Sequence, residues 1–322
     1  MPRPTKRPCG PAGLPVLLVL AGCAAKIPAP PPRPSAPTDL DRAALPDVTL
    51  RGMVVATTRM SRHLAVMGGE KTDERGPVYV YVVQHPDHGT LLIDAGYPRR
   101  TAVDPTDHPG KMAVKLLGLE MGEPAADQLA DLGLEPADID AIVLTHIHDD
   151  HAAGVEDFPG AMLWMDRLDW QFADHARPLK GVAPEMYAGR DVRHPTYTHG
   201  PWGPFERHTD LFGDGTVLLF PAPGHTPGSL LVLVNTPSHS WLFLGDAAWT
   251  DDGWNGPQVK PKGWLPRSVL EDDWKRGIDV LYRVQTLVGR DDLTIVSGHE
   301  PRNVDRLPPW PEPWTTGSST GR

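Results

Sequence analysis

The feature that most constrains how this chain can fold is a cluster of imidazoles and carboxylates directly after an apolar segment. The mainly apolar residues Ile139–Leu144 lead into the run Thr-His-Ile-His-Asp-Asp-His, which ends at His151. Histidine and carboxylate side chains are common ligands of zinc and similar metals near neutral pH. A strand that ends in such a run gathers several ligands around one point, so the pattern predicts a metal site on a loop braced by a strand. The alternative is a polar loop that only solvates the strand end.

Three further candidate ligands follow later in the chain. His225 lies in Pro-Gly-His-Thr-Pro-Gly, where glycines allow sharp turns close to a bound ion. Asp246 ends the segment Trp-Leu-Phe-Leu-Gly-Asp, and a carboxylate there can bridge two cations. His299 ends the segment Ile-Val-Ser-Gly-His. Alone, His225 would be an ordinary loop histidine and Asp246 a turn-capping aspartate, but this order of segments favours a single site.

Together these segments resemble the metallo-β-lactamase superfamily, whose signature His-x-His-x-Asp-His matches the run that ends at His151. The resemblance spans roughly residues 48–306 and implies an α/β fold, the four-layered αββα sandwich of that family. It also implies two divalent metal ions, with Zn²⁺ as the default, although Fe, Mn or Co accept the same ligands. Asp149 falls at a variable position of the signature and is not expected to bind metal. The implied ligands are His146, His148 and His225 for one ion, Asp150, His151 and His299 for the other, and Asp246 shared between them.

The resemblance further implies a chemistry. Two cations lower the pKa of a water between them toward ~7, and the bridging hydroxide attacks the substrate. Asp150 is the predicted catalytic residue, which would carry a proton to the leaving alkoxide. The predicted function is therefore hydrolysis of an ester-type bond in a small molecule, with a lactone as the favoured substrate.

Two alternatives to this function remain open. The first is a phosphodiester or phosphotriester hydrolase, because a two-metal clamp also suits displacement at phosphorus. The second is a non-catalytic metal-binding lipoprotein of the cell envelope. The full ligand set argues against the second, since purely structural zinc sites are usually four-coordinate and closed.

Within the superfamily, the chain looks most like the N-acyl homoserine lactonases, both around the histidine run and in Leu-Ile-Asp-Ala-Gly at residues 92–96. One position departs from their pattern. The lactonases carry a tyrosine three residues after the bridging aspartate, where this chain has Trp249, whose indole can donate one hydrogen bond but has no acidic phenol. Trp249 is therefore a candidate pocket residue. Trp254 and Trp264 are two more, because both lie in the Gly- and Pro-rich loop after Asp246. Such loops seldom form core, so large apolar side chains in them need another role.

The first 46 residues are predicted to precede the folded domain. Residues 1–22 carry basic residues and then an apolar stretch too short to span a bilayer, as in a signal peptide. The sequence Leu-Ala-Gly-Cys resembles a bacterial lipobox, which implies a lipid on Cys23; an ordinary signal peptide with an incidental cysteine is the alternative. The Pro- and Ala-rich residues 23–46 favour an extended tether. These features predict a membrane-anchored protein of the cell envelope, facing outside the cytoplasm, on the outer membrane where the host has one.

The remaining chain is expected to form one metallo-hydrolase domain over residues 47–307, followed by a flexible tail over residues 308–322. The formal net charge of −10, without a basic stripe, argues against nucleic acid as a partner, and no feature specifies an oligomeric state. Periodicity and turn signals predict a hairpin, several buried strands and two helices. The expected strands are 78–83, 90–94, 139–144, 217–220, 230–234 and 241–244, and the expected helices are 125–133 and 271–288.

Overall fold

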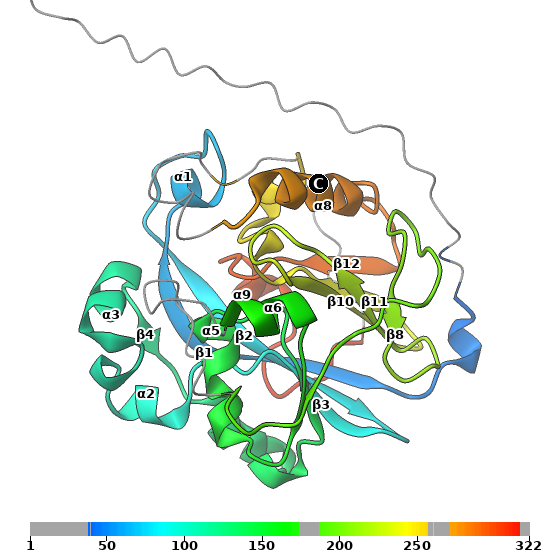
Figure 1. The fold of residues 1–322 in the computed structure, drawn as a ribbon, viewed down its shortest axis with the longest axis horizontal. Coiled ribbons are helices and arrows are strands. Elements are labelled where there is room, and N and C mark those ends of the chain that lie inside the picture. The colour runs from blue at the N-terminus through cyan, green and yellow to red at the C-terminus, as the bar shows by residue number, and fades with distance from the viewer. Residues whose placement is uncertain (1–37, 39, 174–186, 257–259, 261–270, 316–322) are drawn as a thin grey trace, which may run out of the picture. The chain divides into compact units, whose positions relative to one another are not determined.

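The computed structural model describes residues 38, 40–173, 187–256, 260 and 271–315 (Figure 1). The predicted signal peptide, Cys23, most of the predicted tether and Trp264 lie outside these residues. Contacts divide the chain into Met1–Pro31 and Pro32–Arg322, and every described residue belongs to the second unit. Among the described helices, none combines the length and the apolar character that crossing a lipid bilayer requires.

The described strands form two sheets, one of seven strands and one of five. The expected hairpin is present, because the second and third strands pair antiparallel with Tyr81 opposite Ile93. In sheet order, the first sheet is β4 (Glu120–Met121), β1 (Thr49–Met60), β2 (Glu74–His85), β3 (Gly89–Ile93), β5 (Ala141–Val143), β6 (Met162–Trp164) and β7 (Val192–Arg193). The second sheet is β12 (Leu293–Val296), β11 (Ser240–Phe243), β10 (Leu230–Asn235), β9 (Val217–Pro221) and β8 (Thr209–Asp210).

Strand β2 is buried on both faces, and its alternation divides the core into two layers. Successive side chains of a strand point to opposite faces. Tyr79 and Tyr81 pack with Phe243 and other residues of the five-stranded sheet, so this face lies between the two sheets. Val78 and Val80 pack instead with residues of the helices on the outer face of the first sheet. The sheet-on-sheet and helix-on-sheet layers of the predicted αββα sandwich are both present.

Helices flank the sheets, as the helix 274–285 does at the top of Figure 1 and the helices 99–103 and 111–117 do at its left. The predicted helix 125–133 is α4 (Ala125–Gln128) continued by the 3₁₀ turn η3 (Leu129–Leu132), and it ends at Gly133, whose left-handed φ of 68° suits glycine. The predicted helix 271–288 is α8 (Trp274–Gln285), with its first backbone amides capped by Asp273. The other α-helices are α1 (Arg62–Ala65), α2 (Arg99–Val103), α3 (Lys111–Leu117), α5 (Asp149–Ala152), α6 (Arg167–Ala173) and α9 (Asn303–Arg306).

The folded region is longer at both ends than the predicted 47–307. Residues 308–315 were expected in a flexible tail, but Trp314 is only 2% exposed and packs on Trp241 with ring centroids 4.9 Å apart. At the other end, Arg42 was expected in the tether, yet it lies in the 3₁₀ turn η1 (Arg42–Ala44) and pairs with Asp292 at 3.1 Å. The large apolar area of an indole outweighs the Pro-rich composition that suggested a loose tail.

Candidate metal centre

The predicted ligands lie on loops at the ends of strands from both sheets. His146 and His148 follow β5, and Asp150 and His151 lie in the short helix α5 that begins directly after His148. From the second sheet, the loop between β9 and β10 carries His225, β11 leads to Asp246, and β12 leads to His299. The structure brings all seven side chains together in two adjoining groups.

The first group contains His146, His148, His225 and Asp246, with one candidate ligand atom of each within 4.8 Å of the others. His148 Nδ1 lies 2.8 Å from His225 Nε2. Asp246 Oδ2 lies 3.2 Å from His225 Nε2 and 3.9 Å from His146 Nε2. Three imidazole nitrogens and one carboxylate oxygen therefore converge on one point, as the ligands of a zinc-type ion do.

The second group contains Asp150, His151 and His299. Asp150 Oδ2 lies 3.4 Å from His299 Nε2 and 3.8 Å from His151 Nε2. The other oxygen of Asp246, Oδ1, lies 3.0 Å from His299 Nε2 and 3.2 Å from His151 Nε2. Asp246 thus presents one oxygen to each group.

The backbone explains why Asp246 and His299 meet. Strands β11 and β12 are parallel neighbours, and hydrogen bonds continue beyond their ends, from Gly298 N to Ala248 O at 3.0 Å and from His299 N to Trp249 O at 2.9 Å. Gly298 permits this approach, because a Cβ there would lie 2.8 Å from Asp246 Oδ1. Parallel pairing therefore places these two ligands side by side.

The donor set fits divalent metal ions. Among the described residues, His146 Nε2 is a buried polar atom without a hydrogen-bond partner, and a cation would satisfy it. Burial lowers the pKa of His146 and His148 well below the usual value, which keeps their lone pairs available. Burial raises the pKa of Asp246, but its histidine neighbours, led by His299, outweigh burial and hold that pKa well below its ordinary value.

Two of the ligands are oriented by acceptors on the far side of the ring. Asp94 Oδ2 accepts a hydrogen bond from His151 Nδ1 at 2.7 Å, while Asp94 Oδ1 accepts one from Thr145 N at 2.7 Å. His299 Nδ1 donates to Pro77 O at 2.9 Å. These bonds turn both Nε2 atoms toward the centre. The role of Asp94 was not predicted from the sequence, although an aspartate at a strand end before Ala-Gly marks a candidate.

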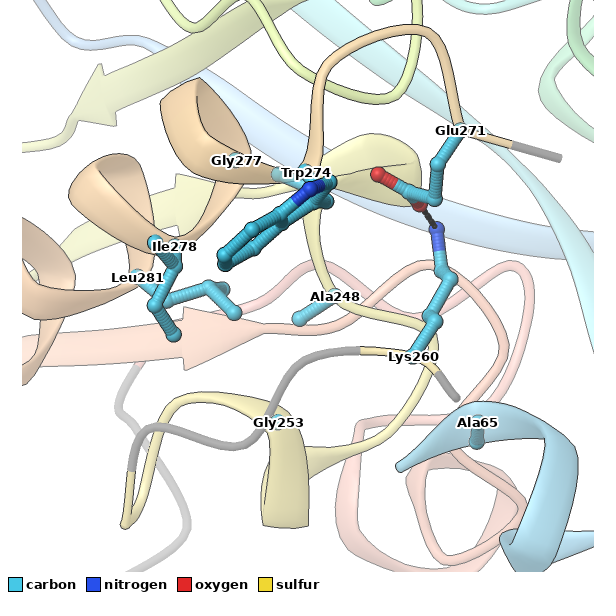
Figure 2. A pocket seen from close by; sticks show the side chains of 10 residues that line it. Ala65, Ala248, Gly253, Lys260, Glu271, Trp274, Gly277, Ile278 and Leu281 are labelled. Carbon is cyan, nitrogen blue, oxygen red and sulfur yellow. Dashed lines mark hydrogen bonds and ion pairs between the residues drawn. The ribbon is translucent and has the colours of Figure 1, made fainter. Parts of the chain in front are cut away.

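Two residues that the sequence analysis did not single out also lie beside the first group. Glu271 Oε1 is 3.2 Å from His225 Nδ1, and Lys260 Nζ is 3.1 Å from the same atom. Figure 2 shows the Lys260 and Glu271 side chains pointing toward one another at the edge of a pocket, with Trp274 and Leu281 of α8 on the opposite wall. No local motif marks either residue, because both reach the centre through tertiary packing.

The candidate pocket tryptophans have different surroundings. Trp249 is half-buried at the centre, and its indole N–H donates to Asp246 Oδ2 at 2.5 Å. Trp254 is 7% exposed and its indole donates to Ser297 Oγ at 2.8 Å, so its N–H is engaged within the domain. Its place in a substrate pocket stays a prediction. Trp264 lies outside the described residues.

A model of the metallo-β-lactamase superfamily matches residues 73–299. The chain is 30% identical over 267 residues to the N-acyl homoserine lactonase AttM of Rhizobium radiobacter. The alignment covers 79% of this chain and 94% of that protein. The chain therefore belongs to the metallo-β-lactamase superfamily, as its motifs predicted. These matches also confirm the prediction of a metal-dependent hydrolase of this superfamily.

Solved structures share the fold. An N-acyl homoserine lactone hydrolase with the product N-hexanoyl-L-homoserine at its catalytic metal center superimposes with a TM-score of 0.65 at 19% identity, over 84% of this chain and 99% of that chain. AidC, a dizinc quorum-quenching lactonase in complex with a product, gives a TM-score of 0.57 at 14% identity, over 86% and 93% of the two chains. At these identities the likeness shows the fold, and the predicted αββα class is confirmed.

Proposed function

We propose that this protein is a dinuclear metal-dependent hydrolase that opens a lactone ring. The observation that carries the proposal is Asp246, whose two oxygens face two separate groups of ligands at 3.0–3.9 Å. The 30% identity to a protein named as an N-acyl homoserine lactonase supports a lactone among ester-type substrates. When bound, two divalent ions, which we take to be Zn²⁺, supply Lewis acidity and lower the pKa of a shared water.

The residues of the chain supply the remaining functions. Asp94 and Pro77 O hold His151 and His299 in one orientation, which fixes the centre before substrate arrives. Asp150 is 22% exposed on its side chain, so it is the carboxylate of the centre that solvent and substrate reach most easily. We assign to it the relay of a proton, which it would accept from the attacking water and pass to the ring oxygen as the acyl C–O bond breaks.

Trp249 supports a particular substrate preference. Its N–H is donated to Asp246 Oδ2, so it polarises the bridging carboxylate and leaves only its ring for substrate contact. Losing one donor to a developing oxyanion typically costs ~2.7–4 kcal/mol. We therefore expect lower kcat/KM on N-acyl homoserine lactones than on aryl esters or more reactive lactones.

A substrate panel tests this function. Zinc-loaded protein would be assayed on aliphatic lactones, N-acyl homoserine lactones, aryl esters and phosphotriesters, with His148→Ala as the inactive control. We expect lactone hydrolysis that a chelator removes and about two equivalents of Zn²⁺ restore. Turnover of phosphotriesters alone would refute the lactone assignment, and full activity with one ion or none would refute the dinuclear centre.

We also propose that a lipid on Cys23 anchors the protein in the cell envelope, outside the cytoplasm. The support is the sequence Leu-Ala-Gly-Cys followed by a Pro- and Ala-rich segment. Native protein should partition into detergent and sediment with membranes, and Cys23→Ser should block the lipidation. Wild-type protein that is soluble and without lipid in its native host would contradict the proposal.

A further inference from the structure

Lys260 is a buried cation beside the metal centre. The residue is 8% exposed, and its Nζ donates to the backbone oxygen of Asp246 at 2.8 Å. The same ammonium lies 4.5 Å from the ring centre of Trp249, within the range of a cation–π contact. The Trp249 N–H donates a hydrogen bond to the Asp246 carboxylate. Lys260 therefore contacts both the backbone of Asp246 and the indole ring that is hydrogen-bonded to its side chain.

A carboxylate accompanies this cation. Glu271 pairs with Lys260 through Oε1, and the same oxygen lies 3.2 Å from His225 Nδ1. Only 15% of the Glu271 side chain and 6% of the Lys260 side chain are exposed. An acceptor at Nδ1 places the imidazole proton there and leaves Nε2 free for a metal, as carboxylate partners of ligating histidines commonly do.

We infer that Lys260 and Glu271 are positioning residues that act as a neutral pair, Glu271 orienting His225 and Lys260 holding the Asp246 turn. A lone ammonium at this place would repel two dications, and a lone buried carboxylate would lack a compensating charge whenever the ions are absent. The pair provides both contacts without adding net charge beside the ions. This inference rests on the proposed metal centre but not on the lactone substrate.

The charge balance gives a test based on metal affinity. Glu271→Gln keeps an amide oxygen that can accept from His225 Nδ1 but leaves the Lys260 ammonium uncompensated, 3.1 Å from that nitrogen. Zn²⁺ affinity, measured by chelator competition, should fall 10–100-fold, the range seen when partners of ligating histidines are changed. The absorption spectrum of Co²⁺-loaded protein should change as well, because an uncompensated ammonium then lies beside the His225 ring.

The double variant Lys260→Met/Glu271→Gln removes both charges and should recover most of the lost affinity. The control is Asp292→Asn, which breaks the ion pair with Arg42 away from the predicted ligands and should leave metal affinity unchanged. Unchanged Zn²⁺ affinity in Glu271→Gln, or a double variant no tighter than the single one, would overturn the inference. If Glu271→Gln does not fold, the double variant decides: affinity within tenfold of wild type supports the neutral pair, and a larger loss overturns it. None of these readouts depends on which substrate the enzyme hydrolyses.

Discussion

Replacing Asp94 by asparagine should weaken the second metal site through the tautomer of His151. The Asp94 carboxylate is 2% exposed and accepts from two fixed donors, Thr145 N and His151 Nδ1, both at 2.7 Å. An asparagine has only one acceptor oxygen. If that oxygen faces Thr145 N, the amide NH₂ faces Nδ1, which must then accept. The proton of His151 moves to Nε2, the atom turned toward the metal centre.

The opposite amide orientation keeps the His151 bond but sets the NH₂ against the Thr145 N–H. This second arrangement leaves one buried hydrogen bond unmade, which costs about 1–3 kcal/mol of stability. Loss of a partner to a ligating histidine typically lowers metal affinity 10–100-fold, or about 1.4–2.7 kcal/mol. The first arrangement therefore predicts a loss of at least tenfold in the affinity for the ion proposed between Asp150, His151 and His299, whereas the second would lower the stability of the fold.

Chelator competition and elemental analysis of dialysed protein measure this loss. Wild type should retain about two ions per chain and Asp94→Asn about one. Asp140→Asn is the matched control, because Asp140 Oδ2 also accepts from a backbone amide, Thr90 N at 2.8 Å, without touching a predicted ligand. Two tightly bound ions of unchanged affinity in Asp94→Asn would refute the tautomer argument.

Three further changes test other parts of the structure. Gly298→Ala would place a Cβ 2.6 Å from Gly245 O and 2.8 Å from Asp246 Oδ1, so thermal unfolding should show a destabilised protein and elemental analysis a reduced metal content. Trp314→Ala should lower the free energy of unfolding in denaturant by about 3–5 kcal/mol, whereas a residue of a flexible tail would have almost no effect. Burial raises the pKa of Asp169 to about 7, so the folded state holds this proton more tightly than the unfolded state. The contribution of this proton to stability is full below the unfolded pKa of about 4 and is lost as the pH rises through 7, by about 4 kcal/mol in all. In Asp169→Asn the free energy of unfolding in denaturant should therefore change less between pH 4 and 7. A pH dependence equal to that of wild type would contradict the raised pKa of Asp169.

The residue types of the centre and their order along the chain were readable from the sequence. His146, His148 and His151 stand close together after an apolar strand, and His225, Asp246 and His299 each follow a short apolar or glycine-bounded segment. Apolar runs with turn signals and the glycine stop at Gly133 likewise predicted strands and a helix. These features are local, since side-chain alternation and backbone conformation depend on near neighbours in the chain.

Tertiary structure alone decided how those residues work together. The two oxygens of Asp246 face different groups only because β11 and β12 run parallel and the sheets bring β5 opposite them. Lys260 and Glu271 approach His225 by packing, without a motif that marks them. Trp314 is buried although it follows the Pro-rich residues 308–313, and Trp254 is buried although its loop is rich in glycine. Burial and side-chain contacts depend on segments that are distant in the chain. The local sequence therefore determined which candidate ligands and aromatic side chains were available, and the packing of the two sheets determined which of them meet.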